Sequence, residues 1–231
     1  MTIANRSITL AEPIFHSICG EGTEIGLPAV FIRTYGCNRR CKYCDSRYSW
    51  ESSGTKTSID SILTQLEAIY QRTNCRRVFL TGGEPTLQEN LQLLMSALSN
   101  QMFGIMLQTN GSQFLPEIFD LANRLLSVDV KGPSSGQLAD LSIISQIYSR
   151  YVLPCPSLIP NVQFKFVVAD VEDFKFAKEV ISRFRMGTFV MQPEYAQGSL
   201  KMITEWLLAD TDLGGMKVRV LPQLHKIMGV K

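Results

Sequence analysis

The sequence alternates between short apolar runs and longer amphipathic stretches. Seven β-branched or aromatic runs are predicted as buried strands, at 29–35, 77–80, 104–108, 127–130, 162–168, 188–192 and 217–221. Apolar residues at helical spacing predict helices at 59–70, 87–99, 116–125, 137–150, 171–185 and 200–209. This order indicates βαβ units around a parallel sheet, and roughly six units fit a short, incomplete α/β barrel. A doubly wound open sheet is the alternative.

Composition and length describe an ordinary globular chain. No repeat, low-complexity tract or linker interrupts residues 1–231, so a single domain is expected, large enough to fold without disulfides. Hydrophobic residues make up 45% and charged residues 19%, which argues against disorder. The net charge of +2 is too small to indicate binding to nucleic acid or a membrane surface. No apolar run approaches the roughly 18–20 residues of a transmembrane helix, and no apolar signal segment is present, so we expect a cytoplasmic protein.

Segments of unusual composition follow the predicted strands directly, at 36–45, 81–85, 109–111, 131–134, 169–170, 193–194 and 222–226. In barrels and open α/β sheets alike, the carboxyl ends of the strands form the ligand-binding face. Lys165 alternates with Phe164 and Phe166, so its side chain is expected on the opposite face of the strand. If that face looks inward, the barrel interior is polar and suits a ligand better than a packed core.

The six cysteines include three within eight residues, Cys37, Cys41 and Cys44. In a reducing compartment such a cluster indicates metal binding or catalysis more than disulfides. A tetrahedral zinc site needs four ligands, but the chain has only two histidines and no second cysteine pair. Three thiolates on an iron–sulfur cubane leave one iron open to an exogenous ligand, which favours a cluster of that kind. Cys75 and Cys155 are predicted as buried apolar residues.

Two motifs together resemble the radical S-adenosylmethionine superfamily. Cys-x3-Cys-x2-Cys, with Tyr43 before its last cysteine, follows the first predicted barrel strand, and Thr81-Gly82-Gly83-Glu84-Pro85 follows the second. The resemblance implies a shortened, incomplete (βα)6-type barrel that forms one radical S-adenosylmethionine domain. It also implies a 4Fe–4S cluster, with S-adenosylmethionine held partly by the backbone and side chain of the Gly-Gly-Glu-Pro segment, where glycines permit close approach to a ligand.

Further segments narrow the resemblance to the 7-carboxy-7-deazaguanine synthases of the queuosine pathway. They are Ile14–Gly22, Gly26–Arg33, Gly36–Asn38, Asp45, Val128–Gly136 and Leu221–Lys226. Because these matches are spread from one end of the sequence to the other, the resemblance covers essentially the whole chain. The family resemblance implies a homodimeric carbon–nitrogen lyase that converts 6-carboxy-5,6,7,8-tetrahydropterin to 7-carboxy-7-deazaguanine with loss of ammonia. It implies a 4Fe–4S cluster, S-adenosylmethionine and Mg²⁺ as cofactors. A small-molecule pterin and an electron donor such as flavodoxin or ferredoxin are the expected partners, without nucleic acid or membrane.

The same resemblance assigns residues to each ligand. Cluster iron is assigned to Cys37, Cys41 and Cys44, and Mg²⁺ to Ser46. S-adenosylmethionine is assigned to Tyr43, Cys44, Asp45, Gly83, Lys131, Ala169 and Asp170. The pterin is assigned to Ile18, Cys19, Gly20, Arg33 and Thr81. Arg33 has a physical argument of its own, because an unpaired guanidinium in an apolar strand would be costly and a planar carboxylate would satisfy it.

Three positions depart from the family pattern. Cys19 stands where glutamine is common, so a hydrogen bond to the substrate there must come from backbone or be lost. Gln108 stands where glutamate often precedes Thr-Asn-Gly, which removes a negative charge near the cofactor. Ser46 replaces the usual threonine and keeps the hydroxyl that Mg²⁺ would use.

Two other functions fit the cysteine motif. A glycyl-radical-enzyme activase is also short and carries Cys-x3-Cys-x2-Cys, although the segment 15–22 argues against it. A non-enzymatic zinc or iron–sulfur binding module is the other alternative. Iron and sulfide analysis of anaerobically purified protein separates these functions. Near four irons per chain, with a spectral change on adding S-adenosylmethionine, would exclude the zinc module. His225 is interpreted as structural, and no chemistry is assigned to it.

Overall fold

The computed structural model describes residues 6–153 and 161–230, which fold around one 10-stranded sheet. The strands are β1 (Ser7–Leu10), β2 (Phe15–Ile18), β3 (Pro28–Thr34), β4 (Thr55–Ser58), β5 (Arg77–Gly82), β6 (Gly104–Thr109), β7 (Leu125–Asp129), β8 (Asn161–Val168), β9 (Thr188–Pro193) and β10 (Val218–Val220). The α-helices are α1 (Tyr48–Glu51), α2 (Ile59–Thr73), α3 (Leu91–Asn100), α4 (Pro116–Phe119), α5 (Leu141–Tyr151), α6 (Val171–Phe184), α7 (Leu200–Ala209) and α8 (Leu224–Met228).

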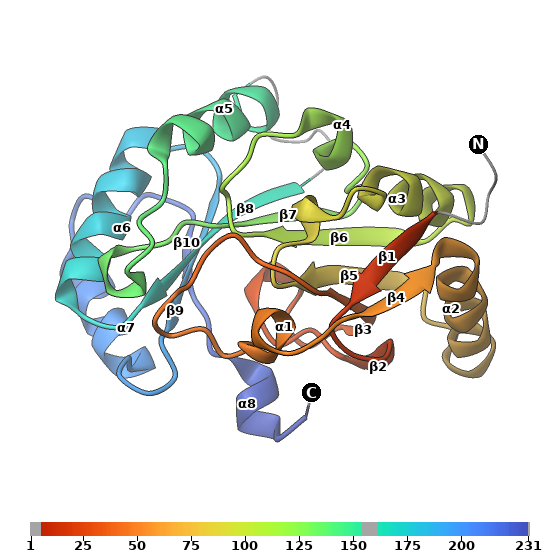
Figure 1. Ribbon diagram of the computed structural model, residues 1–231. Coiled ribbons are helices and arrows are strands. Elements are labelled where there is room, and N and C mark those ends of the chain that lie inside the picture. Colours follow the sequence, from red (N-terminus) through yellow and green to blue (C-terminus); the bar gives the residue numbers. More distant parts are fainter. Residues whose placement is uncertain (1–5, 154–160, 231) are drawn as a thin grey trace.

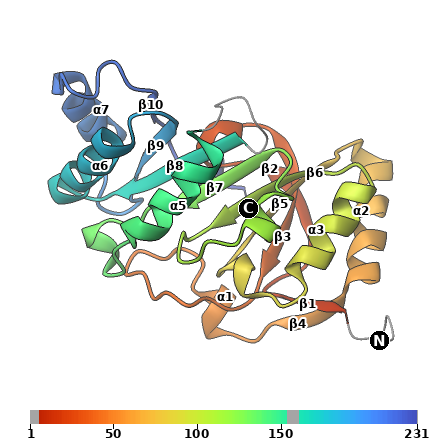
Figure 2. The same cartoon turned by 90° about the horizontal axis from the view of Figure 1, so that it is seen from above.

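The sheet is an open barrel. Strands β3, β5, β6, β7, β8, β9 and β10 are parallel neighbours in that order, while β1, β2 and β4 pair antiparallel at the β3 end. Figure 2 shows an arc whose outer strands, β4 and β10, do not meet. The longer helices lie along the outer side of this arc (Figure 1), whereas a doubly wound sheet would carry helices on both faces. The predicted shortened, incomplete barrel is therefore confirmed, and the doubly wound alternative is wrong.

Apolar side chains on the outer face of the sheet pack against the helices. Val30 and Ile32 of β3 join Leu66 of α2 and Leu94 of α3 in the main core, and all four are fully buried. The helices present apolar stripes to this core because their apolar residues recur every three or four positions. None of the helices in the described residues is long and apolar enough to cross a membrane.

The inner face of the sheet is built in two layers. Phe31, Phe79, Met106 and Leu125 stand in register across β3, β5, β6 and β7 and form an apolar floor. Further toward the carboxyl ends, the inward register positions are polar: Arg33 beside Thr81 and Gln108 beside Ser127 come one step after the floor, and Asp129 beside Lys165 comes one step beyond that. Because side chains alternate between the two faces of a strand, residues two positions apart lie on the same inner face. These polar positions confirm the prediction that polar groups line the interior where Lys165 points.

Some local predictions are wrong. Strands β1, β2 and β4 were not predicted, because their segments, SITL, FHSI and TKTS, contain no continuous apolar run. The predicted helix at 116–125 is a single turn, because Leu125 already begins β7. Cys155 lies outside the described residues.

Candidate active site

A cavity of about 520 Å³ lies at the carboxyl ends of the parallel strands. Most of the residues predicted for cluster, cofactor, substrate and Mg²⁺ line it: Ile18, Cys19, Gly20, Arg33, Cys37, Cys41, Tyr43, Cys44, Asp45, Ser46, Thr81, Gly83 and Lys131. Its volume is within the usual range for small-molecule sites. The C-terminal segment also contributes Gln223, His225 and Lys226 to its lining. The chain thus brings segments from residue 15 to residue 226 together around one space.

The loop between β3 and α1 presents the three clustered cysteines to this cavity. Cys37, Cys41 and Cys44 are half-buried free thiols. Burial raises the pKa of Cys37 and of Cys41, so both are protonated at neutral pH unless a metal ion binds them. A bound metal reverses this, because a coordinating thiol loses its proton. The loop is anchored where Lys42 N donates to Ser135 O at 2.9 Å.

Glycine at position 83 is required by a close backbone approach. A Cβ built there would lie 2.2 Å from Gly36 O, at the start of the cysteine loop. The two loops are joined by Gly83 N donating to Thr34 O at 3.0 Å and Glu84 N donating to Gly36 O at 2.7 Å. The Gly-Gly-Glu-Pro segment therefore holds the cysteine loop directly, in addition to facing the cavity.

The side chain of Glu84 points away from the cavity. It is fully buried, and it accepts hydrogen bonds from Thr109 Oγ1 at 2.8 Å, Asn110 N at 2.6 Å and both the N–H and the hydroxyl of Thr86. Burial raises the pKa of Glu84 despite these donors. The expectation that this side chain receives the ammonium of S-adenosylmethionine is not supported, and the backbone of Gly83 is what faces the cavity.

A chain of buried charges crosses the interior. Lys165 Nζ lies 3.0 Å from Asp129 Oδ1 and contacts Glu21, and Lys131 Nζ donates to Asp129 Oδ2 at 2.8 Å. Burial would raise the pKa of Glu21, but the Lys165 ammonium and a hydrogen bond from Gln223 outweigh it and lower the pKa to about 2. The pKa of Asp129 is lowered too, because Lys131 and Lys165 outweigh its burial.

Gln108 takes part in the same network. Its amide nitrogen donates to Asp129 at 3.3 Å, and its oxygen accepts from Thr81 Oγ1 at 3.4 Å. A glutamate at this position would place a second carboxylate against Asp129. The glutamine of this chain therefore does more than remove a charge, because it supplies a donor to a buried anion.

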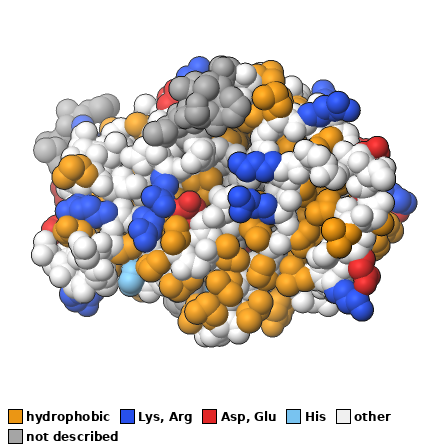
Figure 3. All heavy atoms as spheres, turned by 180° about the vertical axis from the view of Figure 1, so that it is seen from behind, with side chains coloured by type: hydrophobic (Ala, Val, Ile, Leu, Met, Phe, Trp, Pro, Cys, Tyr) orange, Lys and Arg blue, Asp and Glu red, His pale blue; other side chains and the backbone are white. Residues whose placement is uncertain are grey.

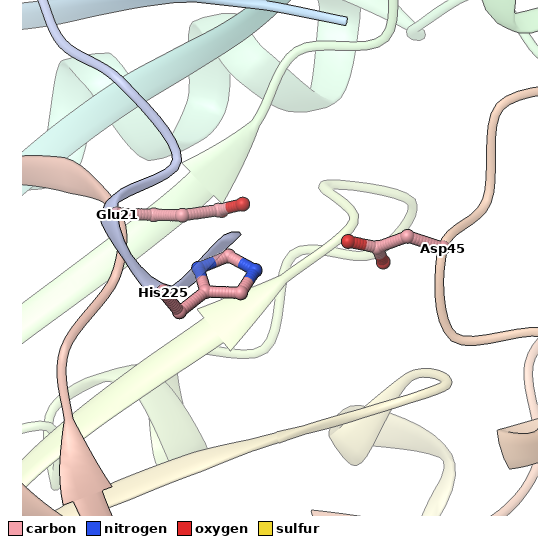
Figure 4. Close-up of side chains that lie close together, drawn as sticks. All are labelled: Glu21, Asp45 and His225. Atoms are coloured by element: carbon pink, nitrogen blue, oxygen red, sulfur yellow. The ribbon is translucent and has the colours of Figure 1, made fainter. Parts of the chain in front are cut away.

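Three ligand-type side chains meet at one side of the cavity. Glu21, Asp45 and His225 approach from three different segments (Figure 4), with one ligand atom of each within 4.8 Å of the others. The carboxylates are already compensated, Glu21 by Lys165 and Asp45 by Lys226 at 3.0 Å. His225 packs against Gly20, where a Cβ would lie 2.0 Å from its Nδ1. Gly20 is therefore needed for the C-terminal segment to close over this side.

Arg33 lines the cavity and is paired. Its Nε donates to Glu12 Oε1 at 2.8 Å, so the guanidinium is not the unpaired charge that the sequence predicts. Desolvation alone therefore does not require a ligand at Arg33. Exposure to the cavity is what keeps it available to one.

Cys19 is a buried thiol in the apolar floor. Burial raises its pKa to about 12, so it is neutral and cannot replace the two hydrogen-bonding groups of a glutamine amide. Its backbone N–H already donates to Leu27 O at 2.8 Å, and its carbonyl accepts from Gly26 N at 2.8 Å. The family's hydrogen bond at this position therefore has no obvious replacement at Cys19 itself.

Two predicted cofactor residues do not line the cavity. Ala169 N donates to Asp173 Oδ2 at 2.9 Å, and Asp170 caps helix α6 by accepting from Asp173 N at 3.0 Å. Asp173 also receives a hydrogen bond from Ser134 N at 3.0 Å. These contacts hold the segments after β7 and β8 together.

Sequence reasoning missed Gln192 at the end of β9. It is 1% exposed, lines the cavity, and its Oε1 has no hydrogen-bond partner among the described residues. The hydroxyl of Tyr43 is also buried without a hydrogen-bond partner among the described residues, and Tyr43 also lines the cavity. A buried acceptor without a donor is costly, so both groups fit a site completed by a polar ligand. Polarity at an inward position of a strand was the signal available for Gln192.

Known proteins resemble this chain over nearly its full length. A model described as the Radical SAM superfamily matches residues 31–142. A 7-carboxy-7-deazaguanine synthase of Thermoplasma acidophilum is 32% identical over 221 residues, covering 95% of this chain and 96% of that protein. One from Chlorobaculum tepidum is 32% identical over 222 residues, covering 92% and 90%. The chain belongs to the 7-carboxy-7-deazaguanine synthase family.

The fold agrees with this family. The crystal structure of QueE from Escherichia coli matches with a TM-score of 0.66 at 19% identity, covering 94% of this chain and 95% of that one. Its relatives and the Radical SAM match show that the chain is a radical S-adenosylmethionine enzyme of 7-deazapurine biosynthesis. Membership of the 7-carboxy-7-deazaguanine synthase family argues against both alternative functions, the glycyl-radical-enzyme activase and the non-enzymatic metal-binding module.

The cavity fits the cofactors of a 7-carboxy-7-deazaguanine synthase, which are a 4Fe–4S cluster and S-adenosylmethionine, with Mg²⁺ typical of the family. Three thiols from one loop, none of them in a disulfide, line the cavity. Basic lining residues outnumber acidic ones, which suits anionic ligands. The basic residues are Arg33, Arg39, Lys42, Arg47, Lys131, Lys165 and Lys226, and the acidic ones are Glu21, Asp45, Asp129 and Glu194.

Proposed function

We propose that this chain converts 6-carboxy-5,6,7,8-tetrahydropterin to 7-carboxy-7-deazaguanine with release of ammonia. The observation that carries the proposal is that Arg33 and the three cysteines Cys37, Cys41 and Cys44 line one cavity. When bound, the reduced cluster and S-adenosylmethionine supply hydrogen abstraction from the carbon that bears the substrate carboxylate. The protein's own contribution is to hold the reacting atoms in register and to exclude water.

The cofactor side of the cavity is formed by the cysteine loop and the ends of β5 and β7. We assign S-adenosylmethionine to the backbone of Tyr43, Cys44 and Asp45, with Gly83 and Lys131 beside it. Lys131 is oriented by Asp129 at 2.8 Å and stands over the Tyr43 ring, 5.9 Å from its centroid. Ala169 and Asp170 act on this site through the loop contacts of Asp173, since neither lines the cavity.

The pterin side is formed by the turn after β2 and by Arg33. We assign Ile18, Cys19 and Gly20 to the edge of the ring system, with Thr81 of β5 beside Arg33. The Arg33 guanidinium receives the substrate carboxylate, because a planar fork of N–H donors matches a carboxylate. The apolar floor keeps this end of the cavity dry, and Phe15 extends it by stacking on Phe31 with ring centroids 5.1 Å apart.

We assign Mg²⁺ to the Ser46 hydroxyl, two residues after Cys44. Mg²⁺ prefers oxygen ligands and usually takes few of them from the protein. Ser46 lines the cavity between the cysteine loop and α1, so substrate oxygens and water could complete the coordination. The ion would orient the substrate and neutralise its charge.

The electron donor is proposed to be an acidic protein such as flavodoxin or ferredoxin. Arg40, Lys42 and Arg47 are exposed on the cysteine loop, within three residues of a cluster cysteine. Opposite charges steer protein encounter, so Arg40→Glu should slow reduction by an acidic donor protein and leave reduction by dithionite unchanged. Equal rates with both reductants would exclude Arg40 from the docking surface.

We propose a homodimer that works in the cytoplasm. Exposed apolar side chains cluster at the C-terminal end, with Ile227 at 68%, Met228 at 52% and Val230 at 40%. Helix α8 lies at the lower edge of Figure 1, and hydrophobic side chains gather at the lower centre of the opposite face (Figure 3). Such an area suits a second copy of the chain. Sedimentation velocity tests the proposed dimer, because Ile227→Glu should shift a dimer to monomer.

The proposed location in the cytoplasm agrees with the cysteine loop. A cluster needs reduced thiols, and the cytoplasm is a reducing compartment.

The experiment that tests the proposed reaction compares two substrate classes. Anaerobically reconstituted enzyme, with reductant, S-adenosylmethionine and Mg²⁺, is given either the carboxypterin or a glycine-containing peptide. The proposal predicts 7-carboxy-7-deazaguanine by mass spectrometry in the first case and no reaction in the second. Turnover of the peptide without turnover of the pterin would overturn it.

A further inference from the structure

Arg33 is held from behind by a carboxylate that does not line the cavity. Its Nε donates to Glu12 Oε1 at 2.8 Å, and the hydroxyl of Tyr48 donates to the same oxygen at 2.8 Å. The guanidinium also lies over the Tyr48 ring, 5.9 Å from its centroid. The Glu12 side chain is only 10% exposed. These three side chains form a single hydrogen-bonded unit.

The fold brings the unit together from three segments. Leu10 of β1 pairs with Thr34 of β3, and Ala11 N donates to Arg33 O at 2.8 Å, so the chain after β1 runs alongside Arg33. Tyr48 is the first residue of α1, directly after the cysteine loop. Glu12 therefore ties the strand that carries Arg33 to the end of the loop that carries the cysteines.

The contact with Glu12 determines which edge of the guanidinium is free. A guanidinium offers a carboxylate two edges, Nε with one terminal nitrogen, or the two terminal nitrogens together. Glu12 occupies Nε. The terminal nitrogens have no hydrogen-bond acceptor among residues 6–153 and 161–230, and Arg33 lines the cavity whereas Glu12 and Tyr48 do not.

We propose that Glu12, supported by Tyr48, is a positioning residue that turns the end-on edge of Arg33 toward the substrate carboxylate. This inference rests on the proposed function, since it takes the carboxylated pterin as the ligand of Arg33. Glu12 does not touch the substrate and acts only through the guanidinium. An arginine fixed in its binding orientation loses less conformational freedom when the carboxylate arrives.

The negative charge of Glu12 opposes its positioning role, so the two effects can be separated by experiment. The Glu12 carboxylate offsets part of the positive charge of Arg33, which by itself weakens attraction for an anionic ligand. Fixed orientation strengthens binding, whereas charge compensation weakens it. Removal of Glu12 shows which effect is larger, because the two effects predict changes of opposite sign.

The test is a ligand comparison in reconstituted holoprotein with S-adenosylmethionine and Mg²⁺ but without reductant, so that no turnover occurs. Calorimetric titration measures binding of the carboxytetrahydropterin and of tetrahydropterin without the carboxylate. Glu12→Ala should weaken binding of the carboxylated ligand about tenfold and leave the other unchanged. Glu12→Gln, which keeps an acceptor for Nε, should lose less. With reductant added, KM should rise in Glu12→Ala more than kcat falls.

Controls separate positioning from general structure. Glu24→Ala removes a glutamate of a similar pair, 2.7 Å from Arg124 and outside the cavity lining, and should leave both affinities unchanged. Tyr48→Phe removes one donor to Glu12 and should give a smaller loss, again for the carboxylated ligand alone. Equal losses for both ligands in Glu12→Ala, or unchanged or tighter binding of the carboxylated one, would overturn the positioning role. Wild type that binds neither ligand would overturn the proposed function as well.

Discussion

Lys165 of β8 stands beside Asp129 of β7 in the sheet register, with its ammonium 3.0 Å from the carboxylate and only 3% of its side chain exposed. The same ammonium contacts Glu21 from the turn after β2. An ion pair this deep is tolerated because each charge has several partners. It holds the turn that would contact the pterin against the strands that face the cofactor.

Replacing Lys165 by methionine tests this network. Lys165→Met leaves two carboxylates near one another with one cation fewer, so the free energy of unfolding should fall by about 3 kcal/mol. Urea denaturation followed by circular dichroism measures it. Lys175→Met is the matched control, because Lys175 pairs with Glu172 at 2.9 Å on the surface, and it should change stability by less than about 0.5 kcal/mol. Equal effects of the two substitutions would mean that the buried network does not contribute to stability.

Acid should remove the contribution of Glu21. Lys165 and Gln223 lower the pKa of Glu21 to about 2 from the usual 4.5. A depressed pKa stabilises the fold above the unfolded value, and this stabilisation is lost as pH falls from 4.5 toward 2. Wild type should therefore be more stable than Glu21→Gln at pH 6, and the difference should shrink steadily below about pH 4.5. A difference that stays constant down to about pH 3 would contradict the lowered pKa.

The cysteine loop makes a prediction that iron analysis can check. Cys37→Ala, Cys41→Ala and Cys44→Ala should each lower bound iron and abolish cleavage of S-adenosylmethionine. Cys75→Ala should leave both nearly intact, because Cys75 is buried in the main core with its thiol donating to Pro28 O at 3.4 Å. Full activity in Cys41→Ala would remove the cluster from this loop.

Ser46 predicts how turnover responds to magnesium. Serine is freer at χ1 than threonine, so it pre-organises its hydroxyl less well. Ser46→Ala should raise the Mg²⁺ concentration needed for half-maximal turnover, and Ser46→Thr should lower it or leave it unchanged. Three coincident titration curves, or a wild type indifferent to Mg²⁺, would show that the hydroxyl does not bind the ion.

Strand–helix alternation predicted the barrel because β-branched runs and helical periodicity are local signals. The antiparallel strands β1, β2 and β4 gave no such signal. Their four-residue segments become strands by pairing with other segments of the chain. Motifs at strand ends placed the cavity correctly for Cys37 and Gly83. The partners of these motifs were not predictable, because Glu12 reaches Arg33 only through the pairing of β1 with β3, and Gln223 reaches Glu21 across almost the whole chain.

Conversion of the carboxypterin can be tested by quantifying its products simultaneously. Anaerobic enzyme with a reconstituted cluster, reductant, S-adenosylmethionine and Mg²⁺ is incubated with 6-carboxy-5,6,7,8-tetrahydropterin, and the pterin, ammonia, deazaguanine and S-adenosylmethionine are measured together. We predict one ammonia and one 7-carboxy-7-deazaguanine for each pterin consumed, with S-adenosylmethionine regenerated, and none of this in Cys41→Ala. Consumption of S-adenosylmethionine in wild type without any deazaguanine would rule out the proposed reaction.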